Sequence, residues 1–213
     1  MSLRDKKILI TAGPTLVPID SVRVISNTAT GGTGILLARK LQSLGAKVTL
    51  LLGGAEPCCL DKKIRLIRFR FFDELKRAML KELKKKYNIV VHSAAVSDYR
   101  PLKSYGHKVG SGRKAWRLEL VPTPKIINLI KRTDRSLFLV GFKFEPETRR
   151  KILIDKAKSL IRRADLDLAV ANTVDRNRYR AYILNKDKIQ DHARSKKHLV
   201  EKLAQSLSKS FNY

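Results

Sequence analysis

The stretch TGILLARKLQSLGAKVTLLLGG, residues 33–54, combines a helix pattern with a strand pattern. Apolar residues recur at helical spacing as far as Gly45, where the glycine predicts the end of the helix. A continuous apolar run follows and predicts a buried strand over residues 46–54. A helix that leads directly into a strand buried on both faces is typical of a parallel sheet covered by helices.

The same alternation continues on both sides of this stretch. Further strands are predicted at residues 6–13, 64–69, 88–96, 137–142 and 166–172. Further helices are predicted at residues 73–87, 123–132, 147–163 and 195–210, with a short extended piece at 116–121 and a hairpin arm at 179–189. We expect an α/β, Rossmann-like three-layer αβα fold with a mostly parallel sheet, in a single domain of residues 1–213 with a flap at about residues 100–120.

The charge of the chain is its strongest compositional feature. Its 213 residues include 46 Lys and Arg against 19 Asp and Glu, a formal net charge of +27. Such a charge attracts nucleic acid, acidic membrane surfaces or phosphorylated metabolites. The basic residues are spread over every segment, as on solvated faces of helices and strands, and no known nucleic-acid-binding motif accompanies them. A basic nucleic-acid-binding protein is therefore an alternative that depends on charge alone, and we expect nucleic acid to bind only nonspecifically.

The remaining composition bears on where the protein works. No apolar run approaches the roughly 20 residues of a membrane helix, and the N-terminus lacks the apolar region of a signal peptide. We therefore expect a cytoplasmic protein without a membrane partner. Cys58 and Cys59 are adjacent and cannot build a disulfide framework, which fits a reducing compartment. We interpret both as loop residues.

The unusual residues follow the predicted strands. Ligands of such sheets bind beyond the carboxyl ends of the strands, near the point where the strand order reverses. After the first strand, SNTATGGTG opens a helix whose free N–H groups could bind an anion. A dinucleotide-dependent reductase is a second alternative, but it would need a G-x-G-x-x-G motif and an acid after the second strand, and the sequence has neither.

Several strand-end motifs together resemble one family. ILITAGPTLVPIDSVRVISNTATGGTG, SAAVSDYRP, GHKVGSG, TPKIINLIK, VGFKFE and DLDLAVANT have the order and spacing of phosphopantothenoylcysteine synthetase, the second activity of many bifunctional coenzyme A biosynthesis flavoproteins. The resemblance extends from about Lys7 to the closing helix. No flavin-binding decarboxylase half stands in front, so the expected protein is the free-standing form of the synthetase.

The resemblance implies a ligase that joins 4′-phosphopantothenate to L-cysteine in coenzyme A biosynthesis. The substrate carboxylate would attack the α-phosphate of a nucleoside triphosphate, and cysteine would then attack the resulting acyl nucleotide, an acyl-CMP if the nucleotide is CTP. Most bacterial members use CTP and eukaryotic members use ATP, both with Mg²⁺, and we expect CTP here. Family members dimerise, so we also expect a homodimer formed through the flap or the hairpin arm.

The resemblance assigns catalytic roles to Asn27 and Lys108. Asn27 matches an asparagine that contacts the acyl intermediate, although a helix N-cap is the ordinary alternative. Lys108 matches a lysine that binds the triphosphate from a glycine-rich loop, and a solvated lysine is its alternative.

The resemblance also implies binding residues. The nucleotide would contact Gly13, Ala94, Ala95, Asp98, Lys108, Pro124, Lys125, Ile126, Ile127 and Phe142, and Asp98 would also bind the metal. The substrate would contact Arg23, Asn27 and Asn172. Core packing, turn chemistry and surface charge are the alternative explanations for these residues. Lys158, Arg162 and Arg163 are further candidates for the triphosphate.

Three segments depart from the family pattern, one of them GFKFE, which replaces Gly-Phe-Ala-Ala-Glu. Ala29, Thr30, Gly31 and Gly32 stand where many members have Ser-Ser-Gly-Lys, and Gly110 replaces a second lysine of the loop. A phosphate-facing lysine is therefore missing, which leaves the choice between CTP and ATP open.

Overall fold

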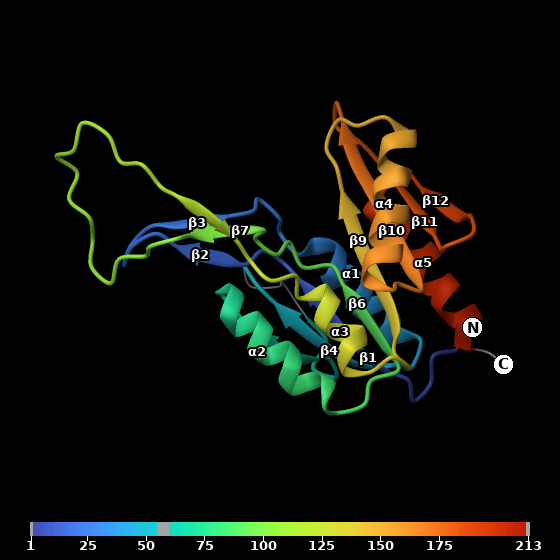
Figure 1. Cartoon of the computed structure of the whole chain (residues 1–213). Helices are drawn as coiled ribbons and strands as arrows, with labels where there is room; N and C mark the ends of the chain where they lie inside the picture. The colour runs from blue at the N-terminus through green and yellow to red at the C-terminus, as the bar shows by residue number, and fades with distance from the viewer. Residues whose placement is uncertain (1, 55–59, 212–213) are drawn as a thin grey trace.

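A computed structural model of the chain describes residues 2–54 and 60–211 (Figure 1). The interpretation of Cys58 and Cys59 as loop residues falls outside these ranges. An eight-stranded sheet has the order β12-β11-β10-β9-β6-β1-β4-β5. Its strands are β1 (Lys7–Ala12), β4 (Lys47–Leu52), β5 (Arg65–Arg68), β6 (Ile89–His92), β9 (Phe138–Phe144), β10 (Leu168–Asp175), β11 (Arg178–Leu184) and β12 (Ile189–Ala193). The six strands from β10 to β5 are parallel, while β11 is antiparallel to both of its neighbours.

Helices cover both faces of the sheet. Helices α1 (Gly32–Ser43) and α5 (Lys196–Phe211) pack on one face, and α2 (Phe72–Leu83), α3 (Ile127–Thr133) and α4 (Arg150–Ala164) pack on the other. Alternate residues of each strand point to opposite layers, so Ile8 and Ile10 join the first core while Leu9 joins the second. Each such fully buried side chain contributes about 1.5–3 kcal/mol. The predicted Rossmann-like three-layer αβα fold is confirmed.

Some predicted boundaries shift for local reasons. Helix α3 begins at Ile127, four residues later than predicted. Pro124 disfavours helical backbone at Thr123, so the helix cannot begin at the predicted residue. The predicted hairpin arm at residues 179–189 is part of the main sheet, since β11 pairs with β10 along its whole length. The turn between them holds Arg176 and Asn177 at φ 44° and 63°, the pattern of a type I′ hairpin turn.

Two hairpins form an arm that projects from the carboxyl edge of the sheet (Figure 1). One hairpin pairs β2 (Leu16–Pro18) with β3 (Val24–Ser26), and the other pairs β7 (Tyr99–Pro101) with β8 (Leu120–Pro122). The loop of residues 102–119 joins β7 to β8. Hydrogen bonds from Tyr105 N to Ile19 O at 3.0 Å and from Ser104 Oγ to Pro18 O at 2.8 Å hold the two hairpins together. We call β2, β3, β7, β8 and their loops the arm.

Candidate functional site

The strand order reverses between β1 and β6, and this defines a crevice at the carboxyl edge. From β1 the chain continues to β4 and β5 on one side, and it then crosses to β6 on the other side. Gly13 follows β1, while Ala94 and Ala95 follow β6. The N–H of Ala95 donates to Gly13 O at 2.9 Å, and Thr15 N–H donates to Ala95 O at 3.2 Å. The structure thus brings three of the predicted nucleotide-binding residues together at the point where such sheets bind ligands.

Three glycines allow the first strand and first helix to approach this crevice closely. A Cβ on Gly13, at φ 81°, would lie 2.0 Å from Gly53 O, and one on Gly31, at φ 75°, would lie 3.1 Å from Gly13 N. A Cβ on Gly34 would lie 2.4 Å from Ala12 Cβ. Tight turning and close helix–strand packing are the tasks that glycines perform in the G-x-G-x-x-G turn. Here the β2–β3 hairpin separates Gly13 from the other two, so the sequence shows no such motif.

Asn27 lies at the rim of the crevice. Its Nδ2 donates to Ala95 O at 3.0 Å, which joins the loop before α1 to the end of β6. Helix α1 begins at Gly32 with Gly31 as its N-cap, so the structure rules out the alternative that Asn27 caps the helix. The N-cap residue Gly31 has no side chain to cap the helix, and the first turn has no acidic residue. The hydroxyl of Thr30 accepts a long hydrogen bond of 3.4 Å from the N–H of Gly32, while further N–H groups of the first turn point out of the helix end.

Asp98 and Lys125 form an ion pair beside the same edge. Lys125 Nζ lies 2.5 Å from Asp98 Oδ1, with side chains 42% and 67% exposed. Thr123 N donates to Asp98 O at 2.9 Å, so the segment before α3 is fixed to the residue that directly precedes β7. The carboxylate predicted to bind the nucleotide and the metal is thus paired with Lys125, a second predicted nucleotide-binding residue.

Two residues of the predicted nucleotide segment belong to the core. Ile126 is 1% exposed and Ile127 is 9% exposed, and both pack with α4 and the sheet. Burial of these side chains corrects the expectation that they line the nucleotide site, because only their backbone could reach a ligand. Pro124 and Lys125 precede the buried pair and are exposed.

Phe142 and Asn172 lie on the neighbouring strands β9 and β10. Phe142 is half-buried against the core, as its alternative explanation proposed. The side-chain oxygen of Asn172 is buried without a hydrogen-bond partner among the described residues, an unusual state for a polar atom. The hydroxyl of Tyr179 is also buried without a partner among the described residues. Tyr179 lies on β11 two residues from Ala181, the register partner of Asn172, so both side chains point to the same face of the sheet. Burial raises the pKa of Tyr179, so its hydroxyl stays protonated. The sequence did not single out Tyr179, because a tyrosine in a strand is common.

Arg23 is engaged within the arm. Its Nη1 donates to Asp20 Oδ2 at 2.7 Å and to Val109 O at 3.2 Å, and its guanidinium lies 5.2 Å from the ring centre of Trp116. Desolvation would raise the pKa of Asp20, but three backbone N–H groups and Arg23 outweigh it and lower this pKa to about 2. Arg23 therefore joins the two hairpins, a role that the sequence did not predict. Its side chain remains 37% exposed.

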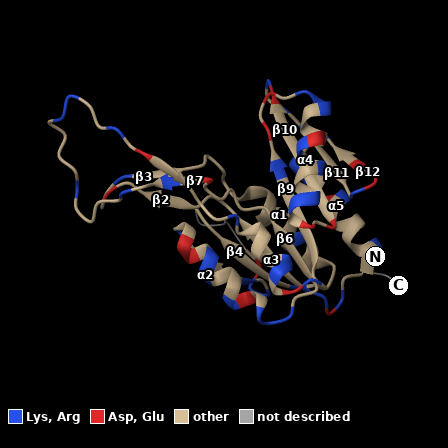
Figure 2. Ribbon diagram, viewed as in Figure 1, with Lys and Arg blue, Asp and Glu red and all other residues tan. Residues whose placement is uncertain are grey.

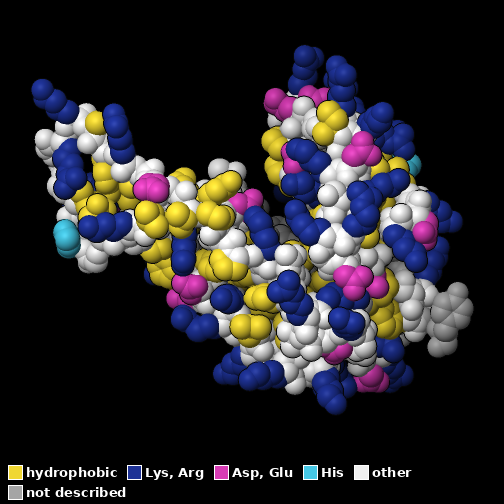
Figure 3. Space-filling model, in the orientation of Figure 1, with side chains coloured by type: hydrophobic (Ala, Val, Ile, Leu, Met, Phe, Trp, Pro, Cys, Tyr) yellow, Lys and Arg dark blue, Asp and Glu magenta, His cyan; other side chains and the backbone are white. Residues whose placement is uncertain are grey.

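Lys108 lies on the projecting loop, directly before Val109, whose N–H donates to Asp20 Oδ2 at 3.1 Å. Its ammonium makes no hydrogen bond or ion pair within residues 2–54 and 60–211, and the side chain is exposed. A Cβ on Gly106 or Gly110 would meet no described atom within 4 Å, so the loop is open at these two glycines, while Val109 between them is buried. No hydrogen bond or ion pair joins Lys108 to Asn27, Ala95 or Asp98 in the described part of the chain. In Figure 3 the molecule is hollowed between the arm and the end of the sheet that carries β9 and β10.

The candidates on α4 lie away from the crevice. Helix α4 connects the parallel strands β9 and β10, so it runs from the carboxyl edge back to the amino edge. Arg162 and Arg163 occupy its last turn at the far edge, which argues against a role at this crevice. Lys143 and Lys156 lie nearer, where they bond Glu145 at 2.8 and 2.6 Å.

The basic residues do not gather at the crevice alone. Lys and Arg are spread over α2, α4, α5 and the loop of the arm (Figure 2).

In the described ranges no helix is long and apolar enough to cross a membrane.

The fold and the crevice define a class of Rossmann-like α/β proteins with a candidate ligand site at the reversal of strand order. Within this class, the chain belongs to the family described as DNA/pantothenate metabolism flavoprotein C-terminal domain, which matches residues 3–210. The predicted family is thereby confirmed.

Individual relatives agree with this family. The chain is 41% identical over 175 residues to the coenzyme A biosynthesis bifunctional protein CoaBC of Thermococcus kodakarensis, covering 81% of this chain and 42% of that protein. It is 35% identical over 173 residues to a cysteine/cysteine sulfinic acid decarboxylase of an unknown prokaryotic organism, covering 81% of this chain and 47% of that protein. The chain thus spans less than half the length of these two relatives. The crystal structure of the DNA/pantothenate metabolism flavoprotein from Streptococcus pneumoniae superposes with a TM-score of 0.87 at 27% identity, covering 96% of this chain and 99% of that one.

Proposed function

We propose that the protein is a phosphopantothenate–cysteine ligase. The observation that carries the proposal is the hydrogen bond of 3.0 Å from Asn27 to Ala95, which joins two family motifs at the crevice. The family match over residues 3–210 supports the same function. No observation at the crevice favours a reductase or a nucleic-acid-binding protein.

The proposed reaction has two steps. An oxygen of the phosphopantothenate carboxylate attacks the α-phosphorus of the nucleotide, and the bond to pyrophosphate breaks. The amine of cysteine then attacks the acyl carbon, the nucleoside monophosphate leaves with the bonding electrons, and the amine loses a proton. Because Asn27 uses one N–H on Ala95, its second N–H and its Oδ1 are available to the acyl group. A donor aimed at the developing oxyanion would favour the second step.

The nucleotide would lie across the carboxyl ends of β1 and β6. Its phosphates would meet the N-terminus of α1, where N–H groups and the helix dipole favour negative charge and no acidic residue opposes it. CTP is the proposed nucleotide on the resemblance alone. Asn172 and Tyr179 offer unpaired polar atoms on the same edge of the sheet, and we propose that Asn172 contacts the substrate.

Mg²⁺ would be held mainly by the phosphates. No group of three His, Cys, Asp or Glu residues that could hold a metal occurs in residues 2–54 and 60–211. Mg²⁺ often binds through one or two carboxylates together with substrate phosphates, and the exposed Asp98 fits as one such ligand if Lys125 turns toward a phosphate. When bound, the ion would neutralise charge at the transferring phosphorus.

The arm would complete the site across a homodimer. Six apolar side chains of the arm are 37–62% exposed: Val22, Val24, Tyr99, Leu102, Leu118 and Leu120. Figure 3 shows apolar side chains gathered on the arm side of the molecule. An apolar patch of this kind is typical of a protein interface. Since no hydrogen bond or ion pair among the described residues joins Lys108 to its own crevice, we propose that the arm delivers it to the crevice of the partner. The cytoplasmic location stays a prediction.

One experiment tests the activity. Purified protein is incubated with 4′-phosphopantothenate and Mg²⁺ and with either CTP or ATP, each with and without L-cysteine, and pyrophosphate is measured. Release with CTP, together with CMP that forms only when cysteine is present, would support the proposal. Release with ATP alone would keep the ligase but overturn the nucleotide, and no release with either would overturn the ligase.

A further inference from the structure

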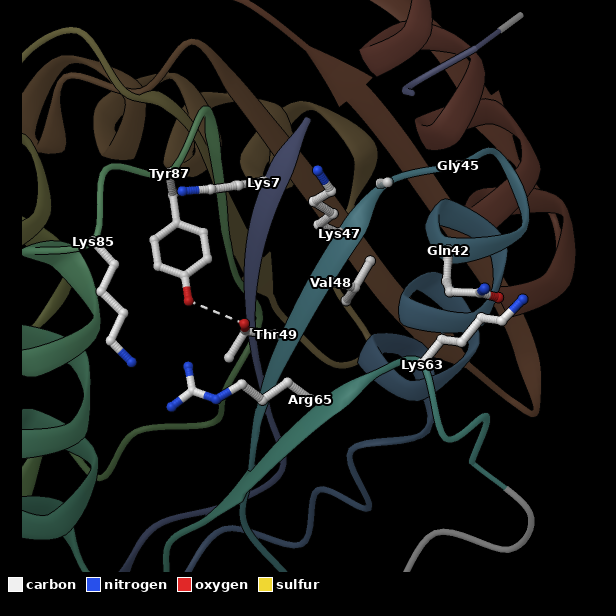
Figure 4. Close-up of a pocket in the computed structure, with 11 residues that line it drawn as sticks. Lys7, Gln42, Gly45, Lys47, Val48, Thr49, Lys63, Arg65, Lys85 and Tyr87 are labelled. Atoms are coloured by element: carbon white, nitrogen blue, oxygen red, sulfur yellow. Dashed lines mark hydrogen bonds between the residues drawn. The ribbon is translucent and has the colours of Figure 1, made fainter. Parts of the chain in front are cut away.

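A cavity of about 540 Å³ lies at the amino edge of the sheet, opposite the crevice (Figure 4). Lys7, Lys47 and Arg65 begin the adjacent strands β1, β4 and β5, and all three line this cavity. Strand β1 has six residues, so at about 3.3 Å per residue the cavity and the crevice are separated by roughly 20 Å. The cavity is therefore distinct from the proposed catalytic site.

The lining of this amino-edge cavity is strongly basic. Its volume lies within the range of small-molecule sites, about 300–1,000 Å³. The cations that line it are Lys7, Lys47, Lys63, Arg65 and Lys85. The other described lining residues are Gln42, Gly45, Ala46, Val48, Thr49 and Tyr87, so none of them is acidic. A cationic ligand would be repelled here, whereas an anion would be attracted.

A buried carboxylate holds two of the cations in place. The side chain of Glu82 is only 2% exposed, and its oxygens accept two hydrogen bonds from Arg65, at 2.7 and 3.1 Å. Lys85 donates to the same carboxylate at 2.8 Å. Desolvation would raise the pKa of Glu82, but hydrogen bonds from Arg65 and its neighbours lower it to about 2, so the carboxylate stays charged. One negative charge thus positions two positive charges, and a net positive charge remains at the cavity.

The positive charges of the other three cations, Lys7, Lys47 and Lys63, are compensated weakly or not at all by acidic residues in the described chain. Lys7 and Lys63 form no ion pair with any residue that the structure describes. Lys47 lies 2.8 Å from Asp5, but these side chains are 65% and 72% exposed, and an exposed pair of this kind contributes about 0–1 kcal/mol. An incoming anion could therefore compete for Lys47 at small cost.

The cations lie on both sides of the strand ends. In Figure 4 the charged ends of Arg65 and Lys85 and the hydroxyl of Tyr87 lie near one another on one side, while Lys63 lies beside Gln42 on the other. The Tyr87 hydroxyl is 2.6 Å from Glu82 and 3.0 Å from the Thr49 hydroxyl. A ligand that neutralises both sides must carry negative charge at more than one point.

We propose that the amino-edge cavity binds a small ligand with a chain of phosphate groups. Phosphate oxygens accept several charge-assisted hydrogen bonds at once, and the arginine and lysines of the cavity are the donors that suit them. The chain of phosphates can come from inorganic polyphosphate or from a nucleotide, because both present the same chemistry. This site is independent of the ligase activity proposed for the crevice.

The test is a titration of the isotope-labelled full chain with tripolyphosphate, and separately with ADP, at constant physiological ionic strength. Backbone amide shifts of Ala46 and Val48 report on the amino-edge cavity without contribution from the crevice. The variant Lys7→Gln/Lys63→Gln removes two cations that have no acidic partner in the described chain. The matched control, Lys186→Gln/Lys197→Gln, removes the same charge from exposed positions elsewhere.

The proposal predicts saturable shifts in the wild type and a Kd about tenfold higher in the cavity variant, with the control within about twofold. Equal affinity for both probes would identify the phosphate chain itself as the ligand, and tighter binding of ADP would identify a nucleotide. The proposal is overturned if neither probe shifts these amides, or if both variants lose affinity equally, since net charge alone would then explain the binding. Duplex DNA and RNA are titrated in the same way, and the proposal is also overturned if they bind while tripolyphosphate and ADP do not.

Discussion

The carboxylate of Asp20 accepts a hydrogen bond of 3.1 Å from the main-chain N–H of Val109, a residue 89 positions further along the chain. The same carboxylate accepts bonds from the N–H groups of Val22 and Arg23 and from the guanidinium of Arg23. Its side chain is fully buried. Because Val109 directly follows Lys108, this one carboxylate determines where the backbone of the proposed triphosphate-binding lysine lies.

Replacing this carboxylate should loosen the arm. In Asp20→Asn, an amide nitrogen must face at least one of the N–H donors, so bonds to Val109 or Arg23 are lost. Hydrogen bonds to charged groups contribute about 1.5–3 kcal/mol, so we expect tryptic cleavage after Lys108 to be at least about tenfold faster. Asp187→Asn, at an exposed turn, is the control. Unchanged cleavage and unchanged amide exchange at Val109 would show that Asp20 does not hold the loop.

Substitutions of the two proposed catalytic residues should affect different steps. Lys108→Gln should reduce pyrophosphate release by about 10²–10³-fold, the range found when one charge-stabilising donor is removed. Asn27→Asp should still release pyrophosphate but form CMP slowly when cysteine is added. Rapid-quench measurement of each product separates the steps. Lys114→Gln, on the same loop, should behave as wild type, and full turnover by both test variants would refute the assignments.

The approach of β1 to the loop after β4 should make Gly13 intolerant of substitution. In Gly13→Ala the new Cβ would lie 2.0 Å from Gly53 O at a φ of 81°. Backbone strain and overpacking together should lower the free energy of unfolding by about 2–4 kcal/mol. Urea unfolding would measure this loss. Gly110→Ala, where a Cβ meets no described atom within 4 Å, should change it by less than about 1 kcal/mol.

The buried His92 should make stability depend on pH. Desolvation lowers the pKa of His92 from 6.5 to about 4, and its Nδ1 lies 2.9 Å from the Thr11 hydroxyl. The unfolded chain binds the proton at higher pH than the folded chain does. The stability that the neutral imidazole contributes is therefore complete above pH 6.5 and is lost as the pH falls toward 4, by about 3 kcal/mol in all. Denaturant titrations across this range should show a flatter profile for His92→Gln, and identical profiles would contradict this role.

The exposed apolar side chains of the arm should determine the oligomeric state. We expect Val22→Ser/Leu102→Ser to convert a dimer into a monomer in sedimentation experiments, because these are the two most exposed apolar residues among those described in the arm. Removing two interface anchors typically costs about 2 kcal/mol or more. Ile152→Ser, at an exposed site on α4, is the control. A wild-type chain that sediments as a monomer at all concentrations would refute the arm-mediated dimer.

The layers of the fold could be predicted because they depend on local patterns. The apolar runs at β4, β6 and β10 indicate strands buried on both faces, and amphipathic spacing indicates α1, α2, α4 and α5. The position of the site could also be predicted, because the carboxyl ends of parallel strands lie together at one edge of the sheet, where ligands bind. Asn27, Ala95 and Asp98 all lie near this edge.

What local patterns could not predict depends on long-range contacts. Asp20 was not singled out from the sequence, because nothing near it in sequence indicates Val109. Arg23 looked available to a substrate, although much of its hydrogen-bonding capacity serves the arm. Ile126 and Ile127 belong to a family motif, but only the packing of α3 shows that their side chains face the core. The amino-edge cavity combines residues from β1, β4, β5 and the end of α2, which no single segment reveals.

The close approach of Gly31 to Gly13 also has a meaning for protein engineering. The first hairpin of the arm leaves the sheet after Gly13 and returns at Gly31, where a Cβ would lie only 3.1 Å from Gly13 N. Two chain points so close together can be joined by a very short link, as at the junctions where inserted modules are tolerated. The hairpin can thus be regarded as a cassette set into an otherwise continuous strand-to-helix turn. The same junction offers a graft point at which arms of different length or partner preference could be exchanged while the eight-stranded sheet is left intact.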